Sequence, residues 1–516
     1  MCHHQQQAND QPASELEATV VDLSEPTEPG RPVSPAHWRI RAVLLLLMPV
    51  LLVILASHFL ANTDPDYWWH VRTGQYIYET RSIPRVDIYS FTAAGRPWIT
   101  HEWLTEVIFY VVQRQLGYVA NVALFGLVAA LTWLAVYASC RLHGMGEPGA
   151  AILLLWGFAM SMASANVRPQ AVTALFVAVY VLLLSHYKHG KRRRLWLLPV
   201  LMVLWVNLHG GYVIGLAFLV MMLVGEAVSR ALRRPSAPLR PLALVSALTL
   251  VASLANPHGV QAWLYPFSYA GVANASMRYI AEWQSPDFHE TYFLIFASSL
   301  LLAVVLGLGR SPLGATGIIW SAALTLMALQ SVRHIPLYAV TVTPLLGARL
   351  KAYLTGFGRP LAERKRPRLL LAYWLLPVIY LLIIAVGGHS GRPLQFSREP
   401  STATYPAGAV AYLRSSDLEG NLFNEYGWGG YLIYELYPER QVFIDGRADV
   451  YGDALVESYI DAVRLRRPWR EVLAENEVSF VLVEKDSALA VVLSDDPCWR
   501  QVYSGNVEGL FVRQTP

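Results

Sequence analysis

Residues 41–72 read RAVLLLLMPVLLVILASHFLANTDPDYWWHVR, an apolar block that runs directly into an acidic and aromatic segment. Residues 41–62 are mostly apolar and reach the length of about 20 residues that a membrane-spanning helix needs. The segment that follows carries its first carboxylate at Asp64. This stretch predicts a membrane helix followed by a loop whose acidic side chains could take part in catalysis or bind a ligand.

Apolar blocks of this kind recur along the 516 residues of the chain. Of these residues 54% are hydrophobic and only 15% are charged, whereas soluble domains carry about a quarter charged residues. The blocks are long rather than amphipathic, which predicts a polytopic α-helical membrane protein with about 11 spans. The expected spans are residues 41–62, 118–140, 149–166, 171–187, 195–209, 211–228, 241–256, 291–308, 314–331, 335–349 and 369–388.

Short loops rich in Lys and Arg predict the orientation, because such loops stay in the cytoplasm. Three basic loops, at residues 188–194, 230–240 and 349–368, fall on one side of the predicted topology. The polar tail of residues 1–36 is then a disordered cytoplasmic segment, and the C-terminal segment is extracytoplasmic. We therefore expect a protein of a bacterial-type inner (plasma) membrane. The basic residues belong to these loops, so the net charge of +4 indicates no nucleic-acid partner.

The C-terminal segment, residues 400–516, has shorter apolar runs than the rest of the chain. Gln441–Ile444 and Val478–Val483 are predicted as strands, and residues 453–466 and 468–476 as helices. This alternation predicts a small extracytoplasmic α/β domain. It follows a transmembrane domain of residues 37–390, whose first outer loop is expected at residues 63–103.

Asp64 and Asp66 open that outer loop, within the string Asp-Pro-Asp-Tyr-Trp-Trp-His. On an extended chain, carboxylates two residues apart point the same way and lie roughly 6–7 Å from each other. Such a pair can hold a divalent cation or face a substrate hydroxyl. The alternative interpretation is a helix cap beside an aromatic belt at the membrane interface.

Polar side chains gather at the helix ends that the topology places outside. The first outer loop ends with His101 and Glu102, and residues 104–111 show the amphipathic spacing of a helix on the membrane surface. Polar groups near the membrane are costly and usually functional, although each could also be an ordinary cap. Cationic side chains among them suit an anionic group such as phosphate. The other polar ends are residues 166–170, 207–211, 256–259, 282–284, 289 and 333–334.

The loop with Asp64, Asp66, His70 and Arg72 resembles the first outer loop of oligosaccharyltransferase catalytic subunits, which belong to the GT-C class of membrane glycosyltransferases. Residues 424–433 (NEYGWGGYLI) and 440–447 (RQVFIDGR) are similar to the region where those proteins carry a Trp-Trp-Asp-Tyr-Gly motif. The chain also resembles uncharacterised bacterial GT-C-like proteins. In this chain the second outer loop contains Arg168 and no acidic pair. The resemblance implies a GT-C-like fold and a sugar donor linked to a polyprenyl phosphate or diphosphate.

Candidate roles follow from this resemblance and from the polar helix ends. The expected catalytic residues are Asp64, Asp66, His101 and Glu102, and Asp64 and Asp66 are also the expected ligands of a divalent cation, Mg²⁺ or Mn²⁺. The residues expected to bind the donor phosphate are His70, Arg72, Arg168, His209, His258, Arg333 and His334. The residues expected on the acceptor side are Trp428, Tyr431, Asp445 and Arg447. The expected partners are a lipid-linked sugar donor and membrane lipid.

Two other function classes are compatible with the sequence. A lipid or sugar transporter or flippase would place charges in mid-helix, whereas here they concentrate at the outer helix ends, and the exception, Glu226, lies near an inner end. A non-catalytic GT-C-like assembly protein would keep the fold and lack the chemistry. For Asp445 and Arg447, an internal ion pair at a strand-end turn is the alternative to acceptor contact. The sequence leaves the sugar, the acceptor, metal dependence and the oligomeric state open.

Overall fold

The computed structural model describes residues 64–162, 166–268, 278–307, 313–356, 404–466 and 468–514. The predicted tail 1–36 and the predicted spans 41–62 and 369–388 lie outside these residues, as does most of the basic loop 349–368. The number of spans and the orientation of the termini therefore stay predictions.

The described residues between 118 and 356 are mainly helical, and each span predicted there overlaps a helix. Among the described residues, three helices are long and apolar enough to cross a membrane: α4 (Tyr118–Leu142), α6 (Gln170–Lys188) and α8 (Tyr212–Ala231). Shorter apolar helices are α5 (Glu147–Ser161), α9 (Leu239–Ala252), α12 (Thr291–Leu306) and α13 (Ala315–Gln330). The region also contains η2 (Arg192–Trp196), α7 (Leu197–Leu208), α10 (Gln261–Ser268), η3 (Ala281–Trp283), η5 (Val332–His334) and α14 (Ile335–Gly356).

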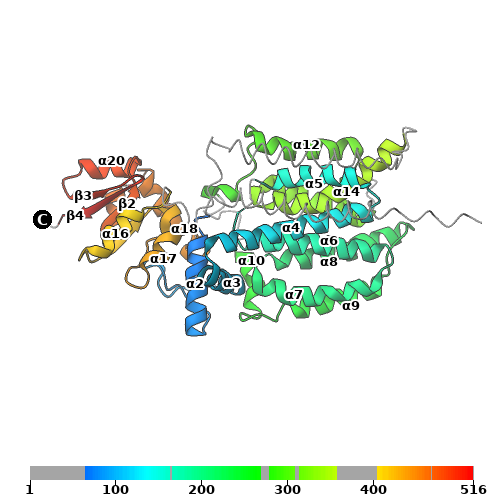
Figure 1. The fold of residues 1–516 in the computed structure, drawn as a ribbon, viewed down its shortest axis with the longest axis horizontal. Coiled ribbons are helices and arrows are strands. Elements are labelled where there is room, and N and C mark those ends of the chain that lie inside the picture. Colours follow the sequence, from blue (N-terminus) through cyan, green and yellow to red (C-terminus); the bar gives the residue numbers. More distant parts are fainter. Residues whose placement is uncertain are drawn as a thin grey trace, which may run out of the picture. The chain divides into compact units, whose positions relative to one another are not determined.

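These helices run side by side, with α4 against α6, α5 against α14, α8 against α13 and α7 against α9 (Figure 1). Aromatic side chains fill the space between them, as where the Trp205 ring stacks on Phe176 with 5.2 Å between the centroids. Large apolar side chains also cover the outside: Val304 is 78% exposed and Leu301 67% exposed. Exposed apolar surface of this extent marks an interaction site. For a helical bundle of this composition, the interacting phase is membrane lipid.

Glu226, near the C-terminal end of α8, is fully buried, and both of its carboxylate oxygens have partners. Its Oε1 contacts Lys188 Nζ and accepts a hydrogen bond from Thr316 Oγ1 at 2.8 Å, and its Oε2 accepts from the Ala237 N–H at 2.6 Å. A buried charge that is paired in this way stabilises one arrangement of the helices. Glu226 therefore gives no support to the transporter interpretation.

The first outer loop and the residues that follow it contain two helices where the sequence predicted only one. The second, α3 (Trp103–Leu116), is the predicted amphipathic helix, whereas α2 (Tyr67–Thr80) was expected to be loop. The expectation of an extended chain at Asp64–Asp66 is wrong, because Asp66 has helical dihedral angles (φ −76°, ψ −21°) and leads into α2. Helices α2 and α3 pack closely at Gly74, where a Cβ atom would stand 1.9 Å from the Glu106 carbonyl oxygen.

The C-terminal region forms an α/β domain around a four-stranded sheet of order β1-β2-β4-β3. Strand β1 is parallel to β2, and the other two pairs are antiparallel. The strands are β1 (Asn421–Asn424), β2 (Val478–Glu484), β3 (Trp499–Ser504) and β4 (Glu508–Arg513). The helices are α16 (Ala407–Ser415), η6 (Tyr426–Trp428), α17 (Gly429–Leu436), α18 (Ala448–Val463), α19 (Trp469–Glu475) and α20 (Ala488–Asp495). The predicted strand at Val478–Val483 and the predicted helices near 453–466 and 468–476 are present.

The predicted strand at Gln441–Ile444 is absent, and its hydrogen bonds show why. The Val442 N–H donates to the Tyr89 carbonyl at 3.0 Å, and the Val442 carbonyl accepts from the Phe91 N–H at 3.2 Å. The Phe443 N–H donates to the side chain of Asn424 at 2.8 Å. This segment lies between the outer loop and β1, with single bridges from Val442 to Ser90 and to Leu422 that do not extend into a strand. The outer loop and the α/β domain consequently share one buried apolar core.

Candidate functional site

Three carboxylates surround the guanidinium of Arg168. Arg168 Nη2 lies 2.8 Å from Asp66 Oδ2, Nε contacts Asp64 Oδ2, and Nη1 contacts Glu282 Oε1. The carboxylates come from the residues before α2 and from η3, and Arg168 lies in the turn before α6. Segments more than 100 residues apart thus converge on one cation. This is expected if the helix ends that carry them lie on the same side of the membrane.

Hydrogen bonds from neighbouring groups hold the carboxylates in place. Asp64 Oδ1 accepts from the Asp66 N–H at 2.9 Å, and Asp64 Oδ2 accepts from Asn166 Nδ2 at 3.0 Å. Asp66 Oδ1 accepts from Trp69 Nε1 at 3.2 Å. The two carboxylates differ in access, because the Asp64 side chain is 1% exposed and that of Asp66 is 18% exposed. Asp64 is therefore a buried anchor, and Asp66 can be reached from outside.

Burial and charge shift the acidities of this cluster. Burial raises the pKa of Asp64 to about 6, against the attraction of Arg168 and with a contribution from the nearby Asp66. Burial lowers the pKa of Arg168, but the attraction of Asp66, Asp64 and Glu282 outweighs it and the net shift is upward. Arg168 therefore stays a fixed cation, while Asp64 can gain a proton in mildly acidic solution.

The predicted Mg²⁺ or Mn²⁺ ion at Asp64 and Asp66 stays a prediction, and it would have to compete with Arg168 for these oxygens. Each guanidinium nitrogen of Arg168 already faces a different carboxylate. A divalent ion at these oxygens would have to displace a guanidinium that is itself largely buried, with a side chain only 16% exposed. The same pairing commits Arg168 to carboxylates, so its predicted contact with the donor phosphate would require these ion pairs to open.

His101, Glu102 and His209 form a second cluster, together with His70 and Glu106. Glu102 Oε1 lies 3.1 Å from His209 Nε2 and 3.4 Å from His101 Nε2, and Glu102 Oε2 lies 3.5 Å from His70 Nε2. His70 Nδ1 lies 3.2 Å from Glu106 Oε1. Glu102 and Glu106 are four residues apart at the start of α3. Residues with this spacing lie on the same face of a helix, and here that face is turned toward α2.

The hydrogen bonds of the histidines assign their protons. His209 Nδ1 accepts from the Gly211 N–H at 2.9 Å, so its Nε2 carries the proton toward Glu102. His101 Nδ1 lies 3.1 Å from the Ile99 carbonyl, which can only accept. Burial alone lowers the pKa of His101, but Glu102 outweighs it and raises the pKa. The histidines in turn hold the pKa of Glu102 well below its usual range, although burial acts in the opposite direction.

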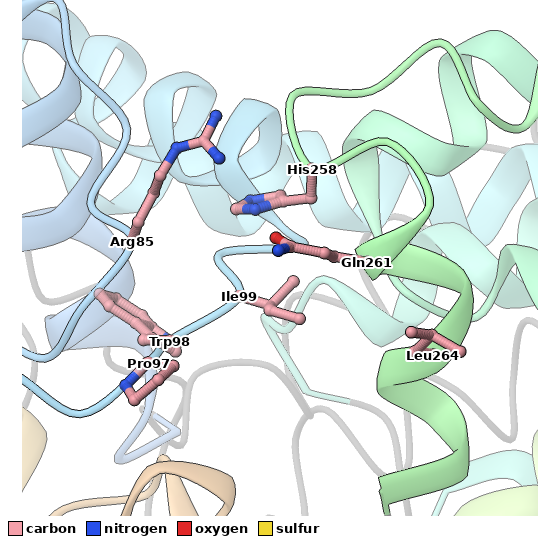
Figure 2. A pocket seen from close by; sticks show the side chains of 7 residues that line it. All are labelled: Arg85, Pro97, Trp98, Ile99, His258, Gln261 and Leu264. Atoms are coloured by element: carbon pink, nitrogen blue, oxygen red, sulfur yellow. The ribbon is translucent and has the colours of Figure 1, made fainter.

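A cavity of about 380 Å³ opens between the outer loop and the segment around α10 (Figure 2). Arg85 and His258 approach each other from the two segments, with Arg85 Nη2 donating to the Pro257 carbonyl at 3.1 Å, and Trp98, Ile99 and Leu264 add apolar walls. His258 is buried, and its Nε2 atom has no hydrogen-bond partner within the part of the chain that the structure describes. Burial lowers the pKa of His258. Arg85 was not among the predicted site residues.

Other predicted phosphate ligands have contacts outside the three carboxylates of the Arg168 cluster. Arg72 donates to Gln75 Oε1 at 2.7 Å and contacts the Tyr437 carbonyl, so it joins α2 to the α/β domain. Arg333 stacks over Trp283, with its guanidinium carbon 4.8 Å from the ring centroid. His334 lies beside it in η5, with Nδ1 3.2 Å from the Met327 carbonyl. Arg333 therefore borders the segment that supplies Glu282.

The residues predicted on the acceptor side are buried. Trp428 donates from Nε1 to the Thr404 carbonyl at 3.0 Å, and Tyr431 stacks on Tyr405 with 4.8 Å between the ring centroids. Asp445 and Arg447 are 0% and 2% exposed, and they form an internal ion pair with 2.6 Å between Oδ2 and Nη2. This geometry agrees with the alternative of an ion pair at a turn, and it leaves Asp445 and Arg447 without a surface toward an acceptor.

Glu106 and Asp87 are functional candidates that the sequence reasoning missed. Glu106 could have been found from its spacing four residues after Glu102 in an amphipathic helix. Asp87 pairs with Arg447, 360 residues away in sequence, and no local pattern points to it.

No protein-family model matches the sequence. No curated protein sequence matches it at a significant level. Solved structures do match its fold. The archaeal oligosaccharyltransferase AglB from Archaeoglobus fulgidus, in complex with an inhibitory peptide and a dolichol-phosphate, aligns with a TM-score of 0.59 and 10% identity over 86% of this chain and 70% of its own. ArnT from Cupriavidus metallidurans bound to undecaprenyl phosphate aligns with a TM-score of 0.52 and 14% identity over 93% of this chain and 98% of its own.

The chain therefore shares its fold with AglB and with ArnT. The apo form of ArnT from the same organism aligns with a TM-score of 0.54 and 15% identity. The resemblance inferred from the first outer loop is thereby confirmed at the level of the fold. In this GT-C fold the Arg168 cluster and the Glu102 cluster both lie where the first outer loop meets the ends of the apolar helices.

Proposed function

We propose that this protein is a membrane glycosyltransferase that moves a sugar from a polyprenyl-phosphate-linked donor to an extracytoplasmic acceptor hydroxyl. The observation that carries the proposal is the set of carboxylates Asp64, Asp66 and Glu282 around Arg168, within a GT-C fold. The dolichol-phosphate and undecaprenyl phosphate in the matching structures support a lipid-linked donor.

Asp66 is the proposed general base, because it is the more accessible of the two aspartates. Its carboxylate takes the proton of the acceptor hydroxyl while the acceptor oxygen bonds to the anomeric carbon of the sugar. The bond from that carbon to the phosphate oxygen breaks, and the lipid phosphate leaves with the electron pair. A direct displacement of this kind inverts the anomeric centre.

Asp64 and Arg168 are proposed as positioning residues for this step. Asp64 is held by Asn166 and by the backbone of Asp66, and it fixes Arg168. Arg168 in turn holds Asp66 at 2.8 Å. A base fixed in this way needs no reorganisation when the acceptor arrives.

The cavity between Arg85 and His258 is the proposed seat of the donor phosphate. A guanidinium and an imidazole face the same space, and both can donate to phosphate oxygens. The apolar wall formed by Trp98, Ile99 and Leu264 suits the flat face of a sugar ring or the start of the lipid chain. Arg333 is the other cation proposed to act on the phosphate.

The test uses the full-length protein in nanodiscs with a panel of sugars linked to radiolabelled polyprenyl phosphate. Release of free polyprenyl phosphate is measured for the unmodified protein, for Asp66→Asn and for Glu79→Gln, a control at an exposed position of the same helix. We expect a loss of about 100-fold or more in Asp66→Asn, since a general base contributes typically 10²–10⁴-fold. Equal release by Asp66→Asn and by the control would overturn the role of Asp66.

A non-catalytic GT-C-like protein is the second candidate, and the pairing of Arg168 with all three carboxylates favours it. Carboxylates neutralised by a fixed cation are weaker bases than free ones. In that case the protein would bind a lipid-linked sugar in the same assay without releasing polyprenyl phosphate from any donor in the panel.

A further inference from the structure

His70, Glu102 and Glu106 form a buried group between α2 and α3. Each offers one ligand atom, and these three atoms lie within 4.8 Å of one another. The residues are 2%, 6% and 1% exposed. One imidazole nitrogen and two carboxylate oxygens are ligands that protein sites use for Zn²⁺ and related divalent metals.

An unpartnered oxygen in this group provides the second observation. Glu106 uses Oε1 toward His70, but its Oε2 is buried and has no hydrogen-bond partner among the described residues. A buried carboxylate oxygen without a partner carries a large desolvation cost. A metal ion bound at this oxygen would remove that cost.

The charges around the group also call for a cation. Two carboxylates are buried side by side, and within the part of the chain that the structure describes their ion-pair contacts are with His70, His101 and His209. The contrast with the Arg168 cluster is direct, because there a guanidinium supplies the positive charge. At His70, Glu102 and Glu106 the balancing charge has to come from protons or from a metal ion.

The groups around Glu102 hydrogen-bond to its carboxylate and orient it, as the residues around a metal ligand do. His209 directs its Nε2 proton to Glu102 Oε1, and its own Nδ1 is held by Gly211. His101 contacts the same carboxylate oxygen at 3.4 Å. Glu102 Oε2 is thereby turned toward His70, at 3.5 Å. Hydrogen bonds that orient a ligating carboxylate in this way are a regular part of metal sites.

We propose that His70, Glu102 and Glu106 bind one divalent transition-metal ion of the Zn²⁺ or Mn²⁺ type. The ion joins the first turn of α2 to the first turn of α3. The His70 N–H donates to the Asp66 carbonyl at 3.2 Å, so the ion also fixes the backbone of Asp66. Its role is structural, and the site is separate from the cluster around Arg168.

Metal content and stability of the full-length protein in detergent test this proposal. The protein is stripped with a chelator and titrated with ZnCl₂, MnCl₂ or CoCl₂ alone, and bound metal is counted by mass spectrometry after desalting. We expect about one ion per chain and a rise in Tm on metal addition, since a ligand that binds only the folded state stabilises it. The cobalt form should show visible absorption bands of a low-coordinate site.

Matched variants decide where the ion binds. Glu106→Gln and His70→Gln keep the size of the side chains, and each should lose the bound ion and the rise in Tm. Asp66→Asn and Glu79→Gln should retain both. Failure of ZnCl₂, MnCl₂ and CoCl₂ to bind the unmodified protein, or equal binding by Glu106→Gln and His70→Gln, would overturn the proposal. None of these readouts depends on glycosyl transfer, so loss of transfer in Asp66→Asn with metal retained would leave the two proposals distinguishable.

Discussion

Arg447 of the α/β domain forms a buried ion pair with Asp87 of the first outer loop, with 2.7 Å between Nη1 and Oδ1. The same guanidinium binds Asp445, and it lies over the rings of Tyr89 and Trp98. Asp87 in turn accepts from the Ser90 N–H at 3.0 Å and from Ser90 Oγ. This network fastens the outer loop to the C-terminal domain, and it places Trp98 at the wall of the cavity beside His258.

Replacing Arg447 by Met should therefore destabilise the protein strongly. The change leaves Asp87 and Asp445 buried without their cation, and removal of one partner from a buried pair costs about 3–5 kcal/mol. The Tm of Arg447→Met in detergent is compared with that of Arg500→Met, whose arginine is exposed on β3. A similar Tm for both variants would show that the network contributes little.

Replacing Arg168 by Ala should convert the carboxylate cluster into a cation site. Asp64, Asp66 and Glu282 would then face a space without a positive charge, and three carboxylates are a common ligand set for Mg²⁺ and Mn²⁺. We expect a lower Tm than in the unmodified protein and a partial recovery when MgCl₂ or MnCl₂ is added. Choline chloride at equal ionic strength is the control, and recovery in both salts would mean that only screening is involved.

The limits of sequence reasoning are visible at this same cluster. Apolar blocks and polar helix ends predicted that Asp64, Arg168 and Glu282 belong to one side of the membrane, because spans alternate. The pairing itself depends on how α6 and η3 approach the start of α2, which is a tertiary relationship with no local signal. The segment Gln441–Ile444 shows the same limit: its composition is that of a strand, but its hydrogen-bond partners are divided between the outer loop and β1.

The stability of the protein should depend on pH through Asp64. Its pKa is about 6 in the folded chain, whereas an unfolded aspartate titrates near 3.9. The folded state therefore binds the proton more tightly, and stability falls as the pH rises from about 4 to 6. Asp64→Asn removes this dependence, so the Tm of the unmodified protein relative to Asp64→Asn should decrease over that interval. A constant Tm difference from pH 4 to 7 would contradict the raised pKa.

Gly446 connects the α/β domain to the proposed base, since a Cβ atom at Gly446 would stand 1.7 Å from Asp66 Oδ1. The clash involves the end of the Asp66 side chain, which can move aside only by giving up its contacts with Trp69 and Arg168. Gly446→Ala should then lower the Tm modestly while shifting the carboxylate away from Arg168. Glycosyl transfer should fall about 10-fold or more, because a base must lie within hydrogen-bond reach of its proton.

The matched control for this variant is Gly427→Ala, where a Cβ atom would meet no atom within 4 Å. Gly427→Ala should preserve both Tm and transfer. If Gly446→Ala kept full transfer, Asp66 would not need its present position, and the role of the base would pass to another carboxylate. A large fall in Tm without a specific fall in transfer would instead assign Gly446 to packing between the outer loop and the α/β domain.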